Sequence, residues 1–335
     1  MSPKGTEAKE EPAFKGKNLH RFVYGPVLSR RLGRSLGVDI LPPKTCNLDC
    51  IYCQLGPTKK RVVTRRPYFR VKDVTEAIKA ALNQFPEIDY ITFSGSGEPT
   101  LNTNLGEIIA EIKNLTSIPV AVLTNSVLLS DKQVRRELLL ADLVVPSLDS
   151  ATQEGFLAVN RPSPEQRLQT VIESLAAFRT EYSGQIWLEI MLVKGVNDDL
   201  DQILKLKPAI SIIKPDKIQL NTVVRPPAEP WALPLEAAEL QAIQALLGPQ
   251  TEIVTETRKR IPSLKTDDLA ETILSTLRRR PASLAELTAM SGESSQRIQK
   301  TIESLLAQGK IVAKEHYHQR QYEIKSKREK NEGAR

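Results

Sequence analysis

Short apolar strands alternate with amphipathic helices along most of this 335-residue chain. Each run of β-branched and aromatic residues is followed by a stretch with the period of a helix. We expect strands at 38–41, 90–94, 120–124, 143–147, 186–193 and 217–221, and helices at 74–84, 105–115, 131–140, 164–179, 200–210 and 235–247. Six strand–helix units in strict alternation predict a parallel sheet with its helices outside.

The number of units limits which parallel architecture the chain can adopt. Six units fall short of the eight of a closed barrel. We therefore expect an α/β fold of the partial (β/α)6 TIM-like barrel type, with a doubly wound open sheet as the alternative. Both arrangements place reactive side chains beyond the carboxyl ends of the strands, so the polar loops there are the first candidates for a site.

The pattern changes near residue 262. Three expected helices, at 267–277, 284–290 and 294–306, are followed by two short strands at 310–314 and 320–325. The short helix, the turn through Gly292 and the amphipathic helix after it have the rhythm of a helix–turn–helix, and the trailing hairpin makes a winged helix the candidate. We therefore expect four parts: a disordered tail at 1–16, a core domain at 17–262, a winged-helix-like domain at 263–325 and a basic tail at 326–335.

Charge and hydropathy narrow the class of protein. The net charge of +7 is compatible with a polyanionic partner but does not require one. No apolar run approaches the roughly 20 residues that span a bilayer, and the N-terminus lacks the apolar centre of a signal peptide. We therefore expect a cytoplasmic protein with no membrane partner. The cysteine content agrees, because three closely spaced cysteines favour a metal site over a disulfide framework.

All the cysteines of the chain, Cys46, Cys50 and Cys53, follow the first expected strand with the spacing C-x3-C-x2-C. A zinc site normally adds a second ligand pair, and none is present near this motif. Three thiolates in one loop suit a [4Fe–4S] cluster, and the missing fourth ligand leaves one iron open. The alternatives are a zinc knuckle or a cluster used only for stability or electron transfer.

The motif, with Tyr52 just before the last cysteine, resembles that of the radical S-adenosylmethionine (SAM) enzymes. The resemblance implies that Cys46, Cys50 and Cys53 ligate a [4Fe–4S] cluster whose open iron binds SAM, and that Tyr52 lies by the adenine. It also implies that an electron from the cluster cleaves SAM to methionine and a 5′-deoxyadenosyl radical, which abstracts hydrogen from a substrate. A flavodoxin- or ferredoxin-like electron donor is then an expected partner.

The stretch "SGSGEPT" at 94–100 ends the second expected strand and supports the resemblance. In the family, a Gly-Glu-Pro stretch at this place receives the amino group of SAM, and Gly97, Glu98 and Pro99 match it. Glycine permits a close approach of the backbone, and proline restricts the turn. The tripeptide alone is most often a plain turn, so its place after the second strand makes it specific.

Polar residues also end the later strands. The expected SAM contacts among them are Thr124, Asn125, Ser147, Asp149 and Glu189. The family places ribose contacts near the fourth strand, which favours Ser147 and Asp149, whereas the alternative for Asp149 is a turn. Glu189 stands out because a carboxylate within an apolar strand requires a partner.

Over about residues 20–230 the chain most resembles a subgroup of Fe–S oxidoreductases related to the tRNA wyosine-synthesis enzymes. No cysteine precedes Cys46, so the second cluster expected of wyosine-forming enzymes cannot form. This absence separates the chain from that reaction. The nearby Arg30, Arg31 and Arg34 either contact RNA phosphates or form a structural turn.

These features together predict a radical SAM enzyme of the oxidoreductase or transferase type. Its substrate is unknown, and RNA, tRNA included, is one candidate. The alternative is an iron–sulfur regulator or sensor that binds nucleic acid without radical catalysis. We expect the C-terminal domain to bind RNA or a protein, with a structural cap over the barrel as the alternative.

Overall fold

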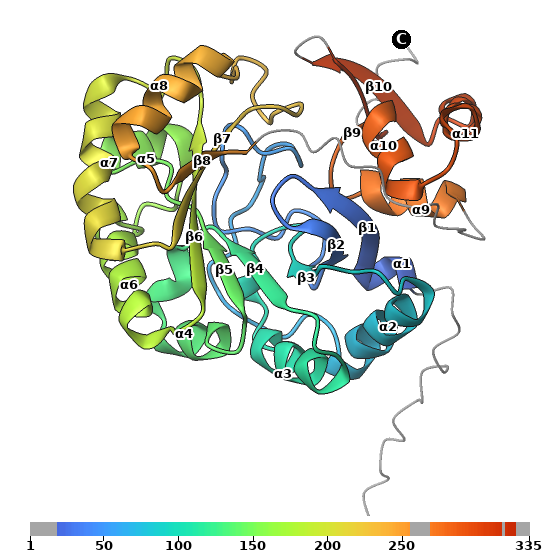
Figure 1. Cartoon of the computed structure of the whole chain (residues 1–335), viewed down its shortest axis with the longest axis horizontal. Coiled ribbons are helices and arrows are strands. Elements are labelled where there is room, and N and C mark those ends of the chain that lie inside the picture. The colour runs from blue at the N-terminus through green and yellow to red at the C-terminus, as the bar shows by residue number, and fades with distance from the viewer. Residues whose placement is uncertain (1–18, 255–268, 317–318, 326–335) are drawn as a thin grey trace, which may run out of the picture.

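The computed structural model describes residues 19–254, 269–316 and 319–325. One sheet of eight strands, paired in chain order, forms its centre (Figure 1). The strands are β1 (Val23–Ser29), β2 (Gly33–Val38), β3 (Tyr90–Phe93), β4 (Val120–Thr124), β5 (Leu143–Pro146), β6 (Gln185–Leu192), β7 (Lys217–Thr222) and β8 (Thr251–Ile253). β1 pairs with β2 in antiparallel fashion, and β2 to β8 are parallel.

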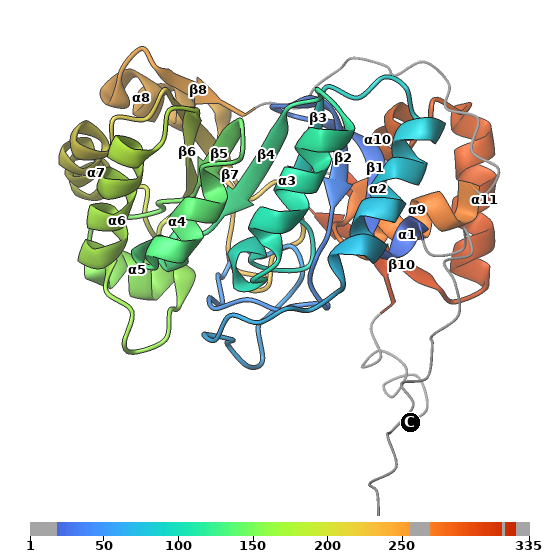
Figure 2. The ribbon, with the colours of Figure 1, turned by 90° about the horizontal axis from the view of Figure 1, so that it is seen from below.

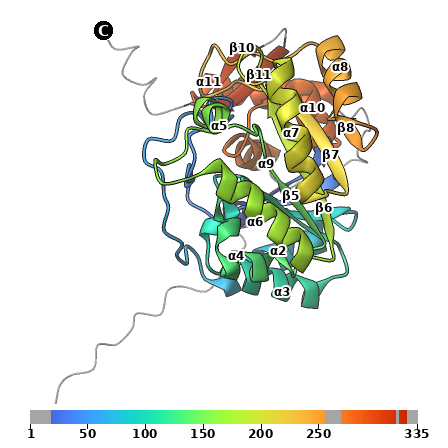
Figure 3. The same ribbon diagram turned by 90° about the vertical axis from the view of Figure 1, so that its left-hand side faces the viewer.

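Helices cover the outer face of this curved sheet (Figures 1 and 2). They are α2 (Val71–Gln84), α3 (Leu105–Leu115), α4 (Lys132–Leu138), α6 (Leu168–Glu181), α7 (Leu200–Ile213) and α8 (Ala237–Leu247). Figure 3 shows α6 and α7 in front of the strands that they cover. The six units from β2–α2 to β7–α8 confirm the partial (β/α)6 barrel. Their sequential strand order excludes the doubly wound sheet, in which the order reverses.

An apolar stripe attaches each outer helix to the sheet. In α2, Val74, Ile78 and Ala81 follow helical spacing, are fully buried, and share one core with β3. Burial of a side chain the size of Val74 or Ile78 contributes roughly 1.5–3 kcal/mol, so these contacts hold the strand ends in place. No helix in the described parts of the chain is both long and apolar enough to cross a lipid bilayer.

The two edges of the sheet differ from the prediction. The first strand was expected at 38–41, but β2 ends at Val38, so most of that range belongs to the following loop. β1 was not predicted, because Gly25 and Pro26 interrupt its apolar run. β8 was not predicted either, since three residues show no recognisable alternation.

The C-terminal residues form a smaller layer beside β1 (Figure 1). Its elements are α9 (Leu269–Leu277), β9 (Ala282–Ser283), α10 (Leu284–Ser291), α11 (Ser295–Ala307), β10 (Ile311–His316) and β11 (Gln319–Ile324). The three helices and the hairpin occur in the expected order, and β9 extends the hairpin to three strands. The predicted tails at 1–16 and 326–335 and the boundary at 262–263 lie outside the described residues.

This C-terminal layer shares buried contacts with the barrel. Tyr24 and Val27 of β1 belong to the same apolar cluster as residues of α9, α10 and α11. Arg279, which follows α9, donates from Nε to Asp39 Oδ2 over 2.8 Å, and both side chains are buried. The layer is therefore packed onto the barrel as part of one folded unit.

Candidate cofactor site

A cavity of about 280 Å³ lies beyond the carboxyl ends of the strands. The long loop between β2 and α2, blue in Figure 2, contributes one wall, and the ends of later strands contribute the others. The three cysteines and seven of the nine expected SAM contacts line it: Cys46, Cys50, Cys53, Tyr52, Gly97, Glu98, Thr124, Asn125, Ser147 and Glu189. The fold therefore gathers residues that are widely separated in the sequence.

Each cysteine sulfur in this cavity has a nitrogen donor beside it. The distances are 3.6 Å from Asn125 Nδ2 to Cys46 Sγ, 3.4 Å from Asn160 Nδ2 to Cys50 Sγ, and 2.9 Å from Lys44 Nζ to Cys53 Sγ. Donors to sulfur favour the thiolate, which is the form that ligates metal. Burial opposes ionisation and raises the pKa of Cys46 to about 12. A cationic group is therefore needed to hold these sulfurs as thiolates.

These sulfurs fit an iron–sulfur cluster better than a single metal ion. No three metal-ligating side chains stand close enough to hold one ion in the parts of the chain that the structure describes. The thiols instead border a shared cavity, where a larger group can bridge them. The donor set, three sulfurs without a fourth, suits a [4Fe–4S] cluster with one open iron.

Backbone contacts hold the cysteine loop from two sides. Ile51 N donates to Val159 O over 2.9 Å, at the end of α5 (Gln153–Asn160). Val62 N donates to Cys46 O over 2.8 Å, so the segment after the cysteines folds back onto the first of them. These bonds determine the direction in which the loop presents its sulfurs.

The loop after β3 approaches the cysteine loop very closely. A side-chain carbon at Gly97 would lie 1.8 Å from Thr45 O, so only glycine fits there. Glu98 is buried, and its carboxylate accepts bonds from Thr100, Thr124 Oγ1 and Asn125 N. Because these contacts occupy both oxygens, Glu98 joins the loop to the end of β4.

Pro99 and Asp149 do not line the cavity, in contrast to the other expected contacts. Pro99 begins the short 3-10 helix η2 (Pro99–Leu101) and is buried. Asp149 lies behind Tyr52 and accepts bonds from Tyr52 Oη and Asn160 Nδ2, each over 2.6 Å. Burial raises the pKa of Asp149 to about 6. Its position suits the orientation of Tyr52 and Asn160.

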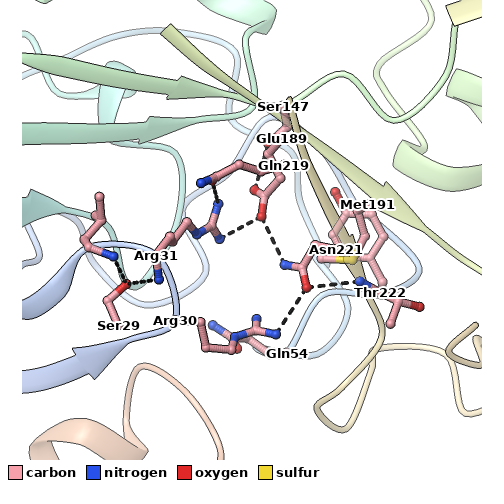
Figure 4. Close-up of polar contacts among 12 residues, drawn as sticks. Ser29, Arg30, Arg31, Gln54, Ser147, Glu189, Met191, Gln219, Asn221 and Thr222 are labelled. Carbon is pink, nitrogen blue, oxygen red and sulfur yellow. Dashed lines mark hydrogen bonds and ion pairs between the residues drawn. The ribbon is translucent and has the colours of Figure 1, made fainter. Parts of the chain in front are cut away.

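Glu189 is the centre of a polar network on the opposite wall (Figure 4). Arg31 Nη2 pairs with Glu189 Oε1 over 2.7 Å, and Asn221 and Ser147 donate over 3.1 and 3.3 Å. Burial disfavours the charged form, but Arg31 and Asn221 outweigh it and hold the pKa of Glu189 below its ordinary value. Arg31 is therefore the partner that a carboxylate in an apolar strand requires.

Sequence reasoning missed several residues of this site. Lys44, Gln54, Asn160 and Arg225 contact the thiols or line the cavity. Lys44 and Gln54 flank the cysteine motif, so proximity in the sequence was a usable signal for them. Asn160 and Arg225 reach the site only through the packing of α5 and of the segment after β7.

The sequence model of the Radical SAM superfamily matches residues 40–206. The chain is 33% identical over 242 residues to UPF0026 protein MJ1312 of Methanocaldococcus jannaschii, covering 72% of this chain and 74% of that one. It is 39% identical over 207 residues to UPF0026 protein slr1464 of Synechocystis, covering 61% and 76%. A protein named GTPase Obg from Brachyspira hyodysenteriae is 36% identical over 307 residues, and this chain, matched over 89% of its length, spans 44% of it.

Proposed function

Because the chain belongs to the radical SAM superfamily, whose enzymes bind a [4Fe–4S] cluster and SAM, we propose that it generates a substrate radical from SAM. When bound, the cluster would supply the electron for the cleavage of SAM to methionine and a 5′-deoxyadenosyl radical, and that radical would abstract hydrogen from the substrate. Cys46, Cys50 and Cys53 would hold the cluster. The observation that supports this proposal is the convergence of three partly buried thiols and the loop after β3 on one cavity.

The protein residues bind and orient SAM in this proposal. The loop at Gly97, whose glycine lets it pack against Thr45 of the cysteine loop, lines the part of the cavity where the methionyl amino group would bind. Tyr52, oriented by Asp149, lies by the adenine. Ser147 and Glu189 lie on the wall where the ribose hydroxyls would bind.

The decisive experiment is anaerobic reconstitution of the cluster, followed by addition of SAM and a strong reductant. We expect 5′-deoxyadenosine, detected by chromatography and mass spectrometry. Cys50→Ala removes a ligand and should lower both iron content and product to background. Asn114→Ala, an exposed position in α3, serves as the control that retains both. Full cluster loading without product would instead favour an iron–sulfur sensor.

We propose that the electron donor is an acidic, flavodoxin- or ferredoxin-like protein that docks beside the cysteine loop. Lys59, Lys60 and Arg61 are exposed on the segment that follows the cysteines. The contact between Val62 N and Cys46 O keeps this segment next to the thiols. A basic surface there would attract an acidic donor to the cluster.

We further propose that the C-terminal layer docks RNA or a protein through α11. Gln296, Arg297 and Lys300 are exposed on this helix. The test is salt-dependent retention of tRNA by the full chain and its loss in Arg297→Glu/Lys300→Glu. A truncation is unsuitable because the layer shares a core with β1. Retention that is unchanged in the double variant would remove α11 from the RNA proposal.

A further inference from the structure

A second cavity, of about 150 Å³, lies beside the cavity that the three cysteines line, which we call the SAM cavity. Its lining includes three separate parts of the chain that carry arginines: the β1–β2 hairpin, the segment after β7 and the residues that follow α9. These parts contribute five arginines to its lining, Arg30, Arg31, Arg225, Arg279 and Arg280. Arg30, Arg31 and Arg225 also line the SAM cavity, so the two spaces share a wall (Figure 4 shows Arg30 and Arg31).

Carboxylates neutralise only part of the charge of these arginines. The ion pairs are Arg31–Glu189, Arg279–Asp39, Arg225–Glu286 and Arg280–Glu286. Five guanidinium groups therefore face three carboxylates, which leaves two positive charges in excess. Arg30 forms no ion pair with any residue that the structure describes, and it donates only to the neutral Asn221 Oδ1, over 3.2 Å.

One arginine of the lining also has a donor without an acceptor. Arg280 Nε is buried and has no hydrogen-bond partner within the described ranges. Burial, together with the nearby charges of Arg225 and Arg31, lowers the pKa of Arg30 to about 9. Buried charges and donors without partners cost free energy, which an anion in the cavity would offset. The arrangement therefore matches a site built for an anionic ligand.

We propose that this second cavity binds a phosphate monoester carried by the substrate. The inference rests on the proposed function, because it assigns the substrate of the same radical reaction to a chemical class. A phosphate monoester carries roughly 1.5 to 2 negative charges near neutral pH, which matches the excess of two. Planar guanidinium groups bind phosphate oxygens in pairs. With its phosphate in this cavity, the rest of the substrate would extend past the shared arginines into the first cavity, where SAM would bind.

An internal phosphodiester of RNA matches the cavity less well. It carries a single negative charge, so one positive charge would stay unpaired.

Two of the arginines, Arg279 and Arg280, come from the C-terminal layer, and Arg279 is buried against Asp39. The C-terminal layer thus forms part of the wall of the site, in addition to its contacts with β1.

The test is calorimetric titration of the cluster-loaded protein with inorganic phosphate at constant ionic strength. Phosphate should bind at least about tenfold more tightly than acetate, because one additional charged hydrogen bond accounts for about a factor of ten in affinity. Arg280→Met should weaken phosphate binding about tenfold or more by the same argument. Arg34→Met, on the same hairpin but paired at the surface with Glu87 and Asp89, should leave phosphate binding unchanged.

Two results would overturn the proposal. One is phosphate binding to the wild-type protein no tighter than acetate binding, which does not depend on the folding of any variant. The other is equal displacement of phosphate by an oligoribonucleotide without a terminal phosphate, which would show recognition of phosphodiesters. Formation of 5′-deoxyadenosine from SAM is measured separately on the wild-type protein. A failure of phosphate binding is thereby distinguished from a failure of the radical function.

Discussion

At the scale of single residues, the amide donors next to the thiols are placed to change the reduction potential of the cluster. Asn160 Nδ2 lies 3.4 Å from Cys50 Sγ and is buried at the end of α5. Hydrogen bonds to ligand sulfurs stabilise the more negative, reduced state and so raise the reduction potential. We therefore expect Asn160, which no sequence motif indicated, to position Cys50 and to raise the reduction potential of the cluster.

Asn160→Ala should lower the reduction potential of the bound cluster. A hydrogen bond of about 1 kcal/mol corresponds to roughly 40 mV for one electron, so a shift of a few tens of millivolts is expected. Spectroscopic redox titration of the loaded protein measures this shift, with the exposed Asn114→Ala as the control. An unchanged potential at equal iron content would contradict the role of Asn160.

The buried Asp149 predicts a pH dependence of stability. Its pKa is about 6 in the folded protein and near the ordinary 3.8 when unfolded. The folded state therefore holds this proton more tightly, and the stability that the proton contributes is lost as the pH rises from about 4 through 6. About two pKa units correspond to roughly 3 kcal/mol.

Denaturant titrations of the apoprotein between pH 4 and 7 test this assignment. The free energy of unfolding of the wild type should fall by roughly 3 kcal/mol relative to Asp149→Asn over this range. The variant lacks only this titrating group. The other carboxylates titrate in both proteins, so their effect cancels when the two are compared. Parallel pH profiles of the two proteins would show that Asp149 has an ordinary pKa.

At the scale of elements, the segment after the cysteines is basic and lies beside the sulfurs that would hold the cluster. Lys59→Glu/Lys60→Glu should slow reduction of the cluster by an acidic protein donor by about tenfold at low ionic strength. The difference should shrink at high salt, because exposed charges are screened. Reduction by dithionite should not change, since it needs no docking surface.

Stopped-flow measurement of cluster bleaching provides these rates. Lys72→Glu/Lys79→Glu, on the exposed face of α2, makes the same change in net charge away from the cysteine loop. Equal slowing by both double variants would mean that total charge, rather than the segment, attracts the donor.

At the scale of the whole molecule, the buried Arg279–Asp39 pair connects the C-terminal layer to the cofactor loops. Asp39 also accepts bonds from Ser96 N and Ser96 Oγ, over 3.2 and 2.5 Å, in the loop after β3. Arg279→Met leaves Asp39 buried without its cation, so we expect a loss of roughly 3–5 kcal/mol in the free energy of unfolding. Because Asp39 holds Ser96, SAM affinity should fall as well.

Denaturant unfolding and SAM binding by calorimetry measure these two effects. The adjacent Arg278→Met is the matched control, because Arg278 pairs with Glu271 at an exposed site where ion pairs contribute about 1 kcal/mol or less. Weakened stability with unchanged SAM affinity would mean that the pair serves folding alone.

The sequence by itself was sufficient for the features that depend on local pattern. The six strand–helix units follow from the spacing of apolar residues, and the outer helix at 105–115 has the predicted bounds. The cysteine spacing and the Gly-Glu-Pro stretch indicate a cluster and SAM without any tertiary information. Such features are readable because period, turn chemistry and ligand spacing act over short distances along the chain.

Only the tertiary structure decided how distant residues share the site. It separated Asp149 from the cavity wall, paired Glu189 with Arg31, and brought Arg280 next to the β1–β2 hairpin. Sequence spacing contains no information on these contacts, because side chains from different strands meet only when helices and sheet pack together. The second cavity, with its excess of positive charge, is therefore a property of the packed molecule.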